Sequence, residues 1–269
     1  MLKSMRSFLG RKSRAEVPAE AETQATQDMP LPEHQTYIIG DVHGRADLLE
    51  LMLELIDAHI GGTSAADPKL VFVGDYIDLG PDSAVVLARM KELQESFPDN
   101  VTCLMGSHER MMLDFLADPA TRGPRWLRSG AVETLRSFGI ATADLEESPE
   151  FDAYPIAAAT LRRRLPSDTL KWLENLPLSW TSGNLWAVHA GADPGHAMDD
   201  QSARVLLWGH PEFDGGPRGD DIWIAHGHTE IDAPVVSEGR IGTDTGAWRT
   251  GRLTACAVRT NGRYDFLQT

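Results

Sequence analysis

A unit of strand, loop and helix occurs three times in succession in this chain, and that limits the folds open to it. Short apolar runs at 36–40, 69–74 and 101–106 each end in glycine, and a polar loop and a run of apolar residues at helical spacing follow each of them. Short apolar runs bounded by glycine predict buried strands, and the helical spacing predicts amphipathic helices. Three such units in a row predict an α/β fold whose parallel strands are joined by right-handed crossovers.

Ionisable side chains stand directly after these strands. The carboxyl ends of strands are where open α/β sheets place their ligands, so these side chains are candidates for one shared site. Further histidines follow two later apolar runs. The full set is Asp41, His43, Asp75, Asp78, Ser107, His108, Glu109, His189, His226 and His228.

The rest of the chain predicts two further parts. Residues 121–176 show helical spacing and are expected to form a helical insertion beside the sheet. Residues 178–191 predict a hairpin, and four short β segments at 222–228, 233–240, 239–245 and 253–260 suggest a second, largely antiparallel sheet.

Length and local composition limit the class of protein that this chain can be. With 269 residues, 42% of them hydrophobic, a single domain over 35–269 is expected. Residues 1–34, basic and then polar without periodicity, predict a disordered leader. No run approaches the roughly 18 apolar residues of a membrane span and no secretory signal is evident, so a cytoplasmic protein is expected. The two cysteines are expected to be buried free thiols.

The folded part of the chain is strongly acidic. The five Lys and Arg of the first 14 residues leave 20 such residues against 40 Asp and Glu, a formal charge of about −20 for the rest. Such a field repels phosphate backbones, so nucleic acid is not an expected partner. The collected carboxylates and imidazoles are instead the ligands that a pair of divalent cations needs, and carboxylate oxygens can bridge two ions.

Five short motifs resemble, in order and spacing, those of the calcineurin-like metallophosphoesterases, and specifically the bacterial serine/threonine phosphoprotein phosphatase branch. This resemblance implies a four-layer β-sandwich of mixed sheets flanked by helices, and it covers residues 36–260. The motifs are GDVHG (40–44), GDYIDLG (74–80), GSHE (106–109), HAG (189–191) and HGHT (226–229).

The resemblance also implies a role for each matching residue. Asp41 and His43 would hold one metal ion, Asp75 would bridge both ions, and His189 and His228 would hold the second. The ions would be Mn²⁺, with Fe or Zn as alternatives.

In the implied reaction a metal-bridging hydroxide attacks phosphorus in line. His108, oriented by Asp78, would act as the general acid that protonates the leaving oxygen. The implied substrate is a phosphorylated protein or a small phosphomonoester.

The chain departs from the family pattern at three positions. Ser107 stands where the family has an asparagine whose carbonyl binds the second ion, so that ion is expected to bind more weakly. Leu79 and Gly209 replace two phosphate-binding arginines, a loss that can cost on the order of 10² to 10³ in rate. Arg45 and His210 are the candidate replacements for substrate binding.

Two other functions stay open on the sequence. One is a metal-binding or regulatory module of little turnover, and the other is a hydrolase of dinucleoside polyphosphates or phosphodiesters. The arginines of the insertion, Arg125 and Arg128 among them, would either cap the metal cleft or form a solvated face. Trp208 is expected near the cleft.

Overall fold

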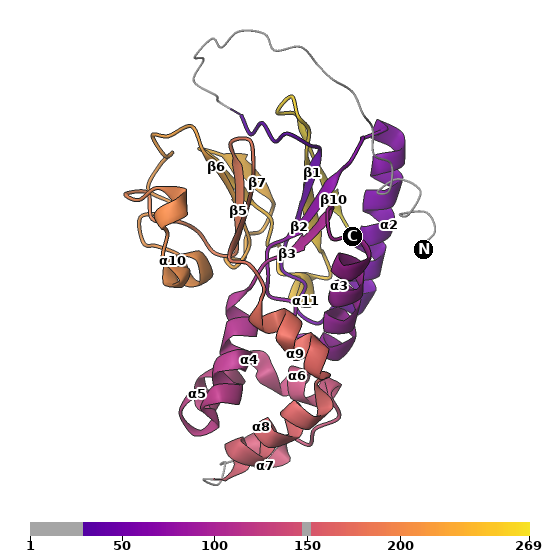
Figure 1. Cartoon of the computed structure of the whole chain (residues 1–269), viewed down its shortest axis with the longest axis vertical. Coiled ribbons are helices and arrows are strands. Elements are labelled where there is room, and N and C mark those ends of the chain that lie inside the picture. The colour runs from indigo at the N-terminus through magenta and orange to yellow at the C-terminus, as the bar shows by residue number, and fades with distance from the viewer. Residues whose placement is uncertain (1–28, 147–151) are drawn as a thin grey trace.

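The computed structural model describes residues 29–146 and 152–269, and its centre is a pair of five-stranded sheets (Figure 1). The first sheet has the order β10-β9-β1-β2-β3, and its three N-terminal strands run parallel, which confirms the repeated-unit prediction. β9 pairs antiparallel with β1, and β10 pairs antiparallel with β9. The strands are β1 (Thr36–Ile39), β2 (Lys69–Phe72), β3 (Val101–Cys103), β9 (Thr254–Val258) and β10 (Tyr264–Gln268).

The second sheet is mixed, with the order β4-β5-β6-β8-β7. Two of its pairings are parallel and two are antiparallel, so the expectation of a largely antiparallel sheet is wrong. The segment 253–260, expected in this sheet, forms β9 of the first. All five β9 residues are buried, which suits a strand covered on both faces. The strands are β4 (Ser179–Ser182), β5 (Leu185–Val188), β6 (Trp223–His226), β7 (Val235–Ser237) and β8 (Arg240–Gly242).

Three hydrophobic layers hold the sandwich together. Ile39 of β1 points into the core that α2 (Ala46–Thr63) and α3 (Ser83–Ser96) build on the outer face of the first sheet. Ile38, its neighbour, points to the opposite face and packs between the two sheets. Ile224 of β6 packs on the far side of the second sheet, where η2 (Met198–Asp200) and α10 (Ala203–Trp208) lie. The predicted four-layer α/β fold is confirmed.

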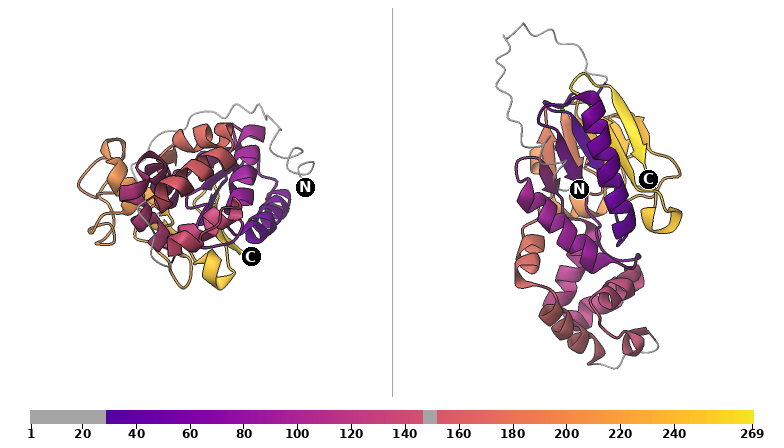
Figure 2. Two further views of the ribbon diagram at one scale, coloured as in Figure 1. Left: turned by 90° about the horizontal axis from the view of Figure 1, so that it is seen from below. Right: turned by 90° about the vertical axis from the view of Figure 1, so that its right-hand side faces the viewer.

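A helical region extends from one end of the sandwich (Figures 1 and 2). Its first helix, α4, is the helix of the third repeated unit, and the later helices fall within the segment predicted as an insertion. Residues 147–151 of that segment lie outside the described part. The helices are α4 (Ser107–Ala117), α5 (Pro119–Trp126), the π-helical turn η1 (Leu127–Ala131), α6 (Val132–Ser137), α7 (Ala143–Glu146), α8 (Ala153–Arg164) and α9 (Ser167–Glu174); α11 (Ala247–Thr250) lies outside the insertion.

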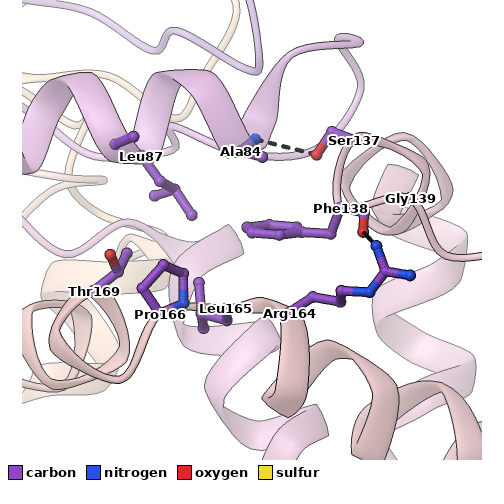
Figure 3. A pocket seen from close by; sticks show the side chains of 10 residues that line it. Ala84, Leu87, Ser137, Phe138, Gly139, Arg164, Leu165, Pro166 and Thr169 are labelled. Carbon is purple, nitrogen blue, oxygen red and sulfur yellow. Dashed lines mark hydrogen bonds between the residues drawn. The ribbon is translucent and has the colours of Figure 1, made fainter.

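The insertion also packs against α3 of the main domain. Ser137 Oγ accepts a hydrogen bond from the Ala84 backbone N–H at 3.1 Å, beside a shallow pocket into which the Phe138 ring projects (Figure 3). Arg164 Nη1 reaches the Phe138 carbonyl at 3.5 Å on the other wall. None of the predicted site residues lines this pocket. The pocket lies where the insertion packs against α3.

The boundary predicted for the leader lies too late in the chain. The backbone N–H groups of Leu31 and Glu33 donate to Asn184 Oδ1 and Ser182 Oγ, so residues 29–34 are fixed on the β4–β5 hairpin and belong to the fold. Residues 1–28 of the predicted leader lie outside the described part. Among the described helices, none is both long and apolar enough to cross a membrane. Both cysteines, Cys103 and Cys256, are buried and free, as predicted.

Candidate metal centre

The strand ends bring most of the predicted site residues together. Two groups of side chains have ligand atoms within 4.8 Å of one another, and Asp75 belongs to both. A carboxylate shared by two groups is the arrangement that a bridged pair of ions requires. The first group is His43, Asp75 and His108; the second is Asp75, His189 and His228.

Two of these imidazoles are held in one orientation by backbone carbonyls. His43 Nδ1 lies 2.8 Å from the Ile77 carbonyl oxygen, and His189 Nδ1 lies 2.9 Å from that of Val73. A carbonyl oxygen only accepts hydrogen bonds, so each Nδ1 carries a proton, and in the neutral ring each Nε2 presents a lone pair. These Nε2 atoms face Asp75 Oδ2, at 3.9 Å from His43 and 3.3 Å from His189. Such carbonyl contacts fix metal-binding histidines in the correct tautomer.

Two buried atoms of the site find no hydrogen-bond partner among the described residues: Asp41 Oδ1 and His189 Nε2. The 3.3 Å separation of His189 Nε2 from Asp75 is short, but the two groups are not aligned for a hydrogen bond. Unpaired buried polar atoms are costly, and a cation would satisfy both of these. The donor set therefore fits divalent ions, as the sequence predicts.

Asp41 belongs to neither of these two ligand groups, but it is hydrogen-bonded to the loop that carries His228. The His228 backbone N–H donates to Asp41 Oδ2 at 3.0 Å, which leaves the unpartnered Oδ1 facing Gly227. A Cβ atom at position 227 would come within 1.8 Å of that oxygen, so only glycine fits there. This close approach explains the glycine between the two histidines of the HGH motif.

The electrostatics of the centre also show a surplus of buried negative charge. Burial, reinforced by Asp244 and Asp75, raises the pKa of Asp41 well above its usual range. Burial likewise raises the pKa of Asp244 to about 6. For Asp75 burial acts in the same direction, but His189 and His108 outweigh it and hold the pKa of Asp75 well below its usual range. Asp244 was missed by the sequence reasoning because it follows a short strand without a neighbouring histidine.

Ser107 is buried beside the shared carboxylate. Its Oγ lies 3.3 Å and 3.5 Å from the two carboxylate oxygens of Asp75, and its side chain is at the start of α4. The structure thus places Ser107 next to Asp75, with a hydroxyl that donates toward the carboxylate. A hydroxyl engaged in this way is a weaker ligand than an amide oxygen would be.

Glu109, the last residue of the same motif, holds two loops together. Its carboxylate accepts hydrogen bonds from the backbone N–H groups of Asp75, Tyr76 and Gly106 at 2.8–3.0 Å, and from that of Ile77 at 3.2 Å. It is fully buried. Glu109 therefore positions the loop that carries Asp75 and Asp78.

His108 and Asp78 form a hydrogen-bonded pair. His108 Nδ1 lies 2.7 Å from Asp78 Oδ2, and its Nε2 lies 3.9 Å from Asp75 Oδ2. Burial lowers the pKa of His108, but Asp75 and Asp78 outweigh burial and raise that pKa to about 9. A proton is therefore retained on this ring at neutral pH, which is the state that a general acid needs.

The helical insertion supplies the other partners of Asp78. Trp126 Nε1, at the end of α5, donates to Asp78 Oδ2 at 2.8 Å, and Thr134 Oγ1 of α6 donates to Oδ1 at 2.5 Å. The carboxylate is fully buried. Sequence reasoning placed Trp126 in the insertion without this contact and missed Thr134, because neither position follows a strand.

Backbone strain is concentrated at the centre. Non-glycine residues with positive φ cost about 1–3 kcal/mol each and persist where the surroundings impose them, often at functional sites. Five of the site residues and their neighbours have this conformation: His43, Asp75, Asp78, Leu79 and His228.

The two candidate substrate-binding residues are engaged elsewhere. Arg45 donates from Nε and Nη2 to Asp47 and from Nη1 to the Ala247 carbonyl. His210 Nε2 lies 3.5 Å from Asp193 Oδ2, and its Nδ1 accepts from the Glu212 backbone. The structure brings neither of them into the two ligand groups.

Comparison with known proteins identifies relatives along most of the chain. The sequence profile of the calcineurin-like phosphoesterases matches residues 34–250. An asymmetrical bis(5'-nucleosyl)-tetraphosphatase of Oceanobacillus iheyensis is 29% identical over 238 residues, which cover 81% of this chain and 86% of the relative. The corresponding enzyme of Bacillus velezensis is 25% identical over 236 residues, with the same coverage of 81% and 86%.

Solved structures share the fold. A cold-active protein-tyrosine phosphatase of a Shewanella species superimposes with a TM-score of 0.56 at 17% identity, over 94% of this chain and 87% of that one. The profile match confirms the predicted family. The two candidate ligand groups consist of residues from its motifs. This chain belongs to the calcineurin-like phosphoesterase family.

Proposed function

We propose that this chain hydrolyses a phosphate ester or anhydride with the help of two divalent cations. The observation that carries the proposal is the shared carboxylate of Asp75, which faces three imidazoles whose Nδ1 atoms are each fixed by an oxygen acceptor. Asp41, His43 and Asp75 would hold one ion, and Asp75, Ser107, His189 and His228 the other. When bound, the ions would lower the pKa of a water molecule and neutralise phosphoryl oxygens.

The residues of the chain then have separate tasks. A hydroxide derived from water forms the new bond to phosphorus while the bond to the leaving oxygen breaks, and that oxygen takes the proton from Nε2 of His108. Asp78 keeps His108 oriented and favours its protonated form, because its carboxylate accepts the Nδ1 proton. In-line displacement requires the attacking oxygen and the general acid to be on opposite sides of the reacting phosphorus.

Two classes of substrate fit this chemistry. A phosphorylated protein or small phosphomonoester is the class that the motifs predict. A dinucleoside polyphosphate is supported by the relatives named bis(5'-nucleosyl)-tetraphosphatases, which match over most of their own length. Cleavage of an anhydride releases a less basic leaving group than an alkoxide, so that reaction depends less on His108.

A test of the proposal measures metal content and the Mn²⁺-stimulated hydrolysis of p-nitrophenyl phosphate and of diadenosine tetraphosphate. We expect the native protein to bind two ions per chain and to turn over at least one of the two substrates. Asp75→Asn should lose both ions and lower the rate by about 10² or more, since its carboxylate serves both groups.

Asp114→Asn is the matched control, because Asp114 pairs with Arg110 on the exposed side of α4. It should leave metal content and rate unchanged. A native protein that binds no Mn²⁺, or that binds it and hydrolyses neither substrate, would contradict the proposal.

A further inference from the structure

An arginine of the insertion contacts an aromatic ring that lies beside the candidate metal centre. The guanidinium carbon of Arg125, on α5, lies 4.3 Å from the centroid of the Trp208 ring, on α10. The Trp208 ring in turn meets the His228 ring edge to face, with centroids 6.4 Å apart and an interplanar angle of 86°. α5 and α10 lie on the same side of the molecule (Figure 1). Trp208 therefore contacts both Arg125 and His228, a candidate metal ligand. The sequence analysis expects Trp208 near the metal site.

The guanidinium of Arg125 carries no ion pair within the described residues. Its contact with Trp208 is a cation–π interaction, which holds the group without neutralising it. Arg125 shares the lack of an ion pair with several described arginines, Arg122 and Arg128 among them, but Arg125 is the one that contacts a ring next to a candidate metal ligand. An unpaired cation in a chain of formal charge −15 is available for an anion from solution.

Its position favours a phosphate group other than the one attacked. The guanidinium contacts the Trp208 ring and that ring contacts His228, so the cation lies next to the candidate ligands without belonging to either ligand group. A planar guanidinium stacked on an aromatic face keeps its outer N–H groups free for two parallel hydrogen bonds to phosphate oxygens. Such a cation would hold the next phosphate of a chain whose reacting phosphate lies on the ions.

We propose that Arg125, stacked on Trp208, forms a second phosphate-binding subsite, and that the substrate therefore carries at least two linked phosphates. This inference rests on the proposed function, because it takes the metal centre as the place of the reacting phosphate. It narrows the two substrate classes above to the polyphosphate class. It also gives one of the insertion arginines a function at the cleft rather than on a solvated face.

The test measures binding instead of turnover. Dissociation constants of inorganic triphosphate and orthophosphate are determined by calorimetry on the Mn²⁺-loaded full chain and on three variants. Native protein should bind triphosphate more tightly than orthophosphate. Arg125→Ala should weaken triphosphate by about tenfold or more, the usual effect of losing a charge-assisted hydrogen bond, and orthophosphate by clearly less.

Two further variants sharpen the comparison. Arg125→Lys keeps the charge but loses the planar fork, so it should restore only part of the triphosphate affinity. Arg122→Ala is the matched control, because Arg122 is an exposed arginine one turn earlier on α5. It should leave both constants unchanged. Removal of Mn²⁺ by triphosphate would affect all variants alike, so the differences between variants isolate Arg125.

The outcomes separate this inference from the proposed function. If native protein prefers triphosphate and Arg125→Ala reduces that preference by about tenfold or more, the subsite is supported. If Arg125→Ala weakens both anions equally, weakens neither, or matches Arg122→Ala, the subsite is overturned while the metal-dependent hydrolysis can stand. If the native protein shows no preference for triphosphate, the subsite is likewise overturned. A chain that binds no Mn²⁺ overturns both.

Discussion

Trp126 donates a hydrogen bond from Nε1 to Asp78 Oδ2 at 2.8 Å, and that same oxygen lies 2.7 Å from His108 Nδ1. The helical insertion therefore fixes the carboxylate that orients the candidate general acid. Trp126 and Asp78 are 48 residues apart in the sequence, and both are fully buried. The insertion is thereby part of the proposed catalytic arrangement.

Trp126→Phe should lower the rate of hydrolysis by about tenfold, since one hydrogen bond to a charged group is lost while a smaller aromatic ring keeps most of the packing. The loss should be larger for aryl phosphates with poor leaving groups, because these depend most on proton donation. A plot of log kcat/KM against the pKa of the leaving group checks this.

Trp172→Phe provides the control for that variant. Trp172 Nε1 donates a hydrogen bond of 3.4 Å to Gln94 Oε1, and Gln94 is not one of the candidate site residues. It should leave the slope of the plot as in the native protein. An equal loss for all leaving groups in Trp126→Phe would show that the contact serves folding rather than proton donation.

Ser107→Asn should raise the affinity for the second ion. An amide oxygen is a better ligand for a cation than a hydroxyl that donates to Asp75. Titration with Mn²⁺ should then show a second binding step at lower metal concentration. Ser107→Ala, which removes the hydroxyl and adds no ligand, should not show this shift. Leu79 stands where the family has a phosphate-binding arginine, and its side chain packs against Gly130 of η1. The double variant Leu79→Arg with Ser107→Asn tests whether restoring both family residues raises the activity further.

Stabilisation by Mn²⁺ should depend on pH. Burial raises the pKa of Asp244 to about 6, and burial also raises the pKa of Asp41 well above its usual range. Each folded pKa exceeds the unfolded one, so in the metal-free protein Asp244 costs stability as pH rises from about 4 through 6, and Asp41 has an effect of the same sign. A bound cation offsets that cost at pH 7.5 and competes with protons at pH 5.5.

We therefore expect the increase in Tm on addition of Mn²⁺ to be larger at pH 7.5 than at pH 5.5. Differential scanning calorimetry with and without the ion at each pH removes the effects of titrating groups that the ion does not contact, and protonation of the candidate histidine ligands shifts the result in the same direction as protonation of the carboxylates. An equal or larger shift at pH 5.5 would be inconsistent with carboxylate ligands of raised pKa.

The two thiols should not react in the folded protein. Burial raises the pKa of both Cys103 and Cys256, so the reactive thiolate is scarce and inaccessible at pH 8. Titration with an aromatic disulfide reagent should find about zero reactive thiols before unfolding and two in denaturant. Rapid reaction of either thiol in the native chain would indicate a more open core than the structure has.

The sequence by itself determined the repeated unit and the chemistry at its ends. Short apolar runs that end in glycine and helical spacing are local patterns, so they identify strands β1–β3 and the side chains that follow them. They do not identify which strand lies beside which, because the pairing is decided by packing across the sandwich. For that reason β9 was placed in the wrong sheet and β10 was not anticipated.

Only the tertiary structure decided how the site residues meet. The partners of Asp78 on the insertion, the acidic neighbour Asp244 and the stack of Arg125 on Trp208 join segments that share no local pattern. Such contacts depend on where whole helices pack, which is set by the buried faces of many residues together. The strand ends fix which ligands are present, and the packing of the insertion fixes which of them can act together.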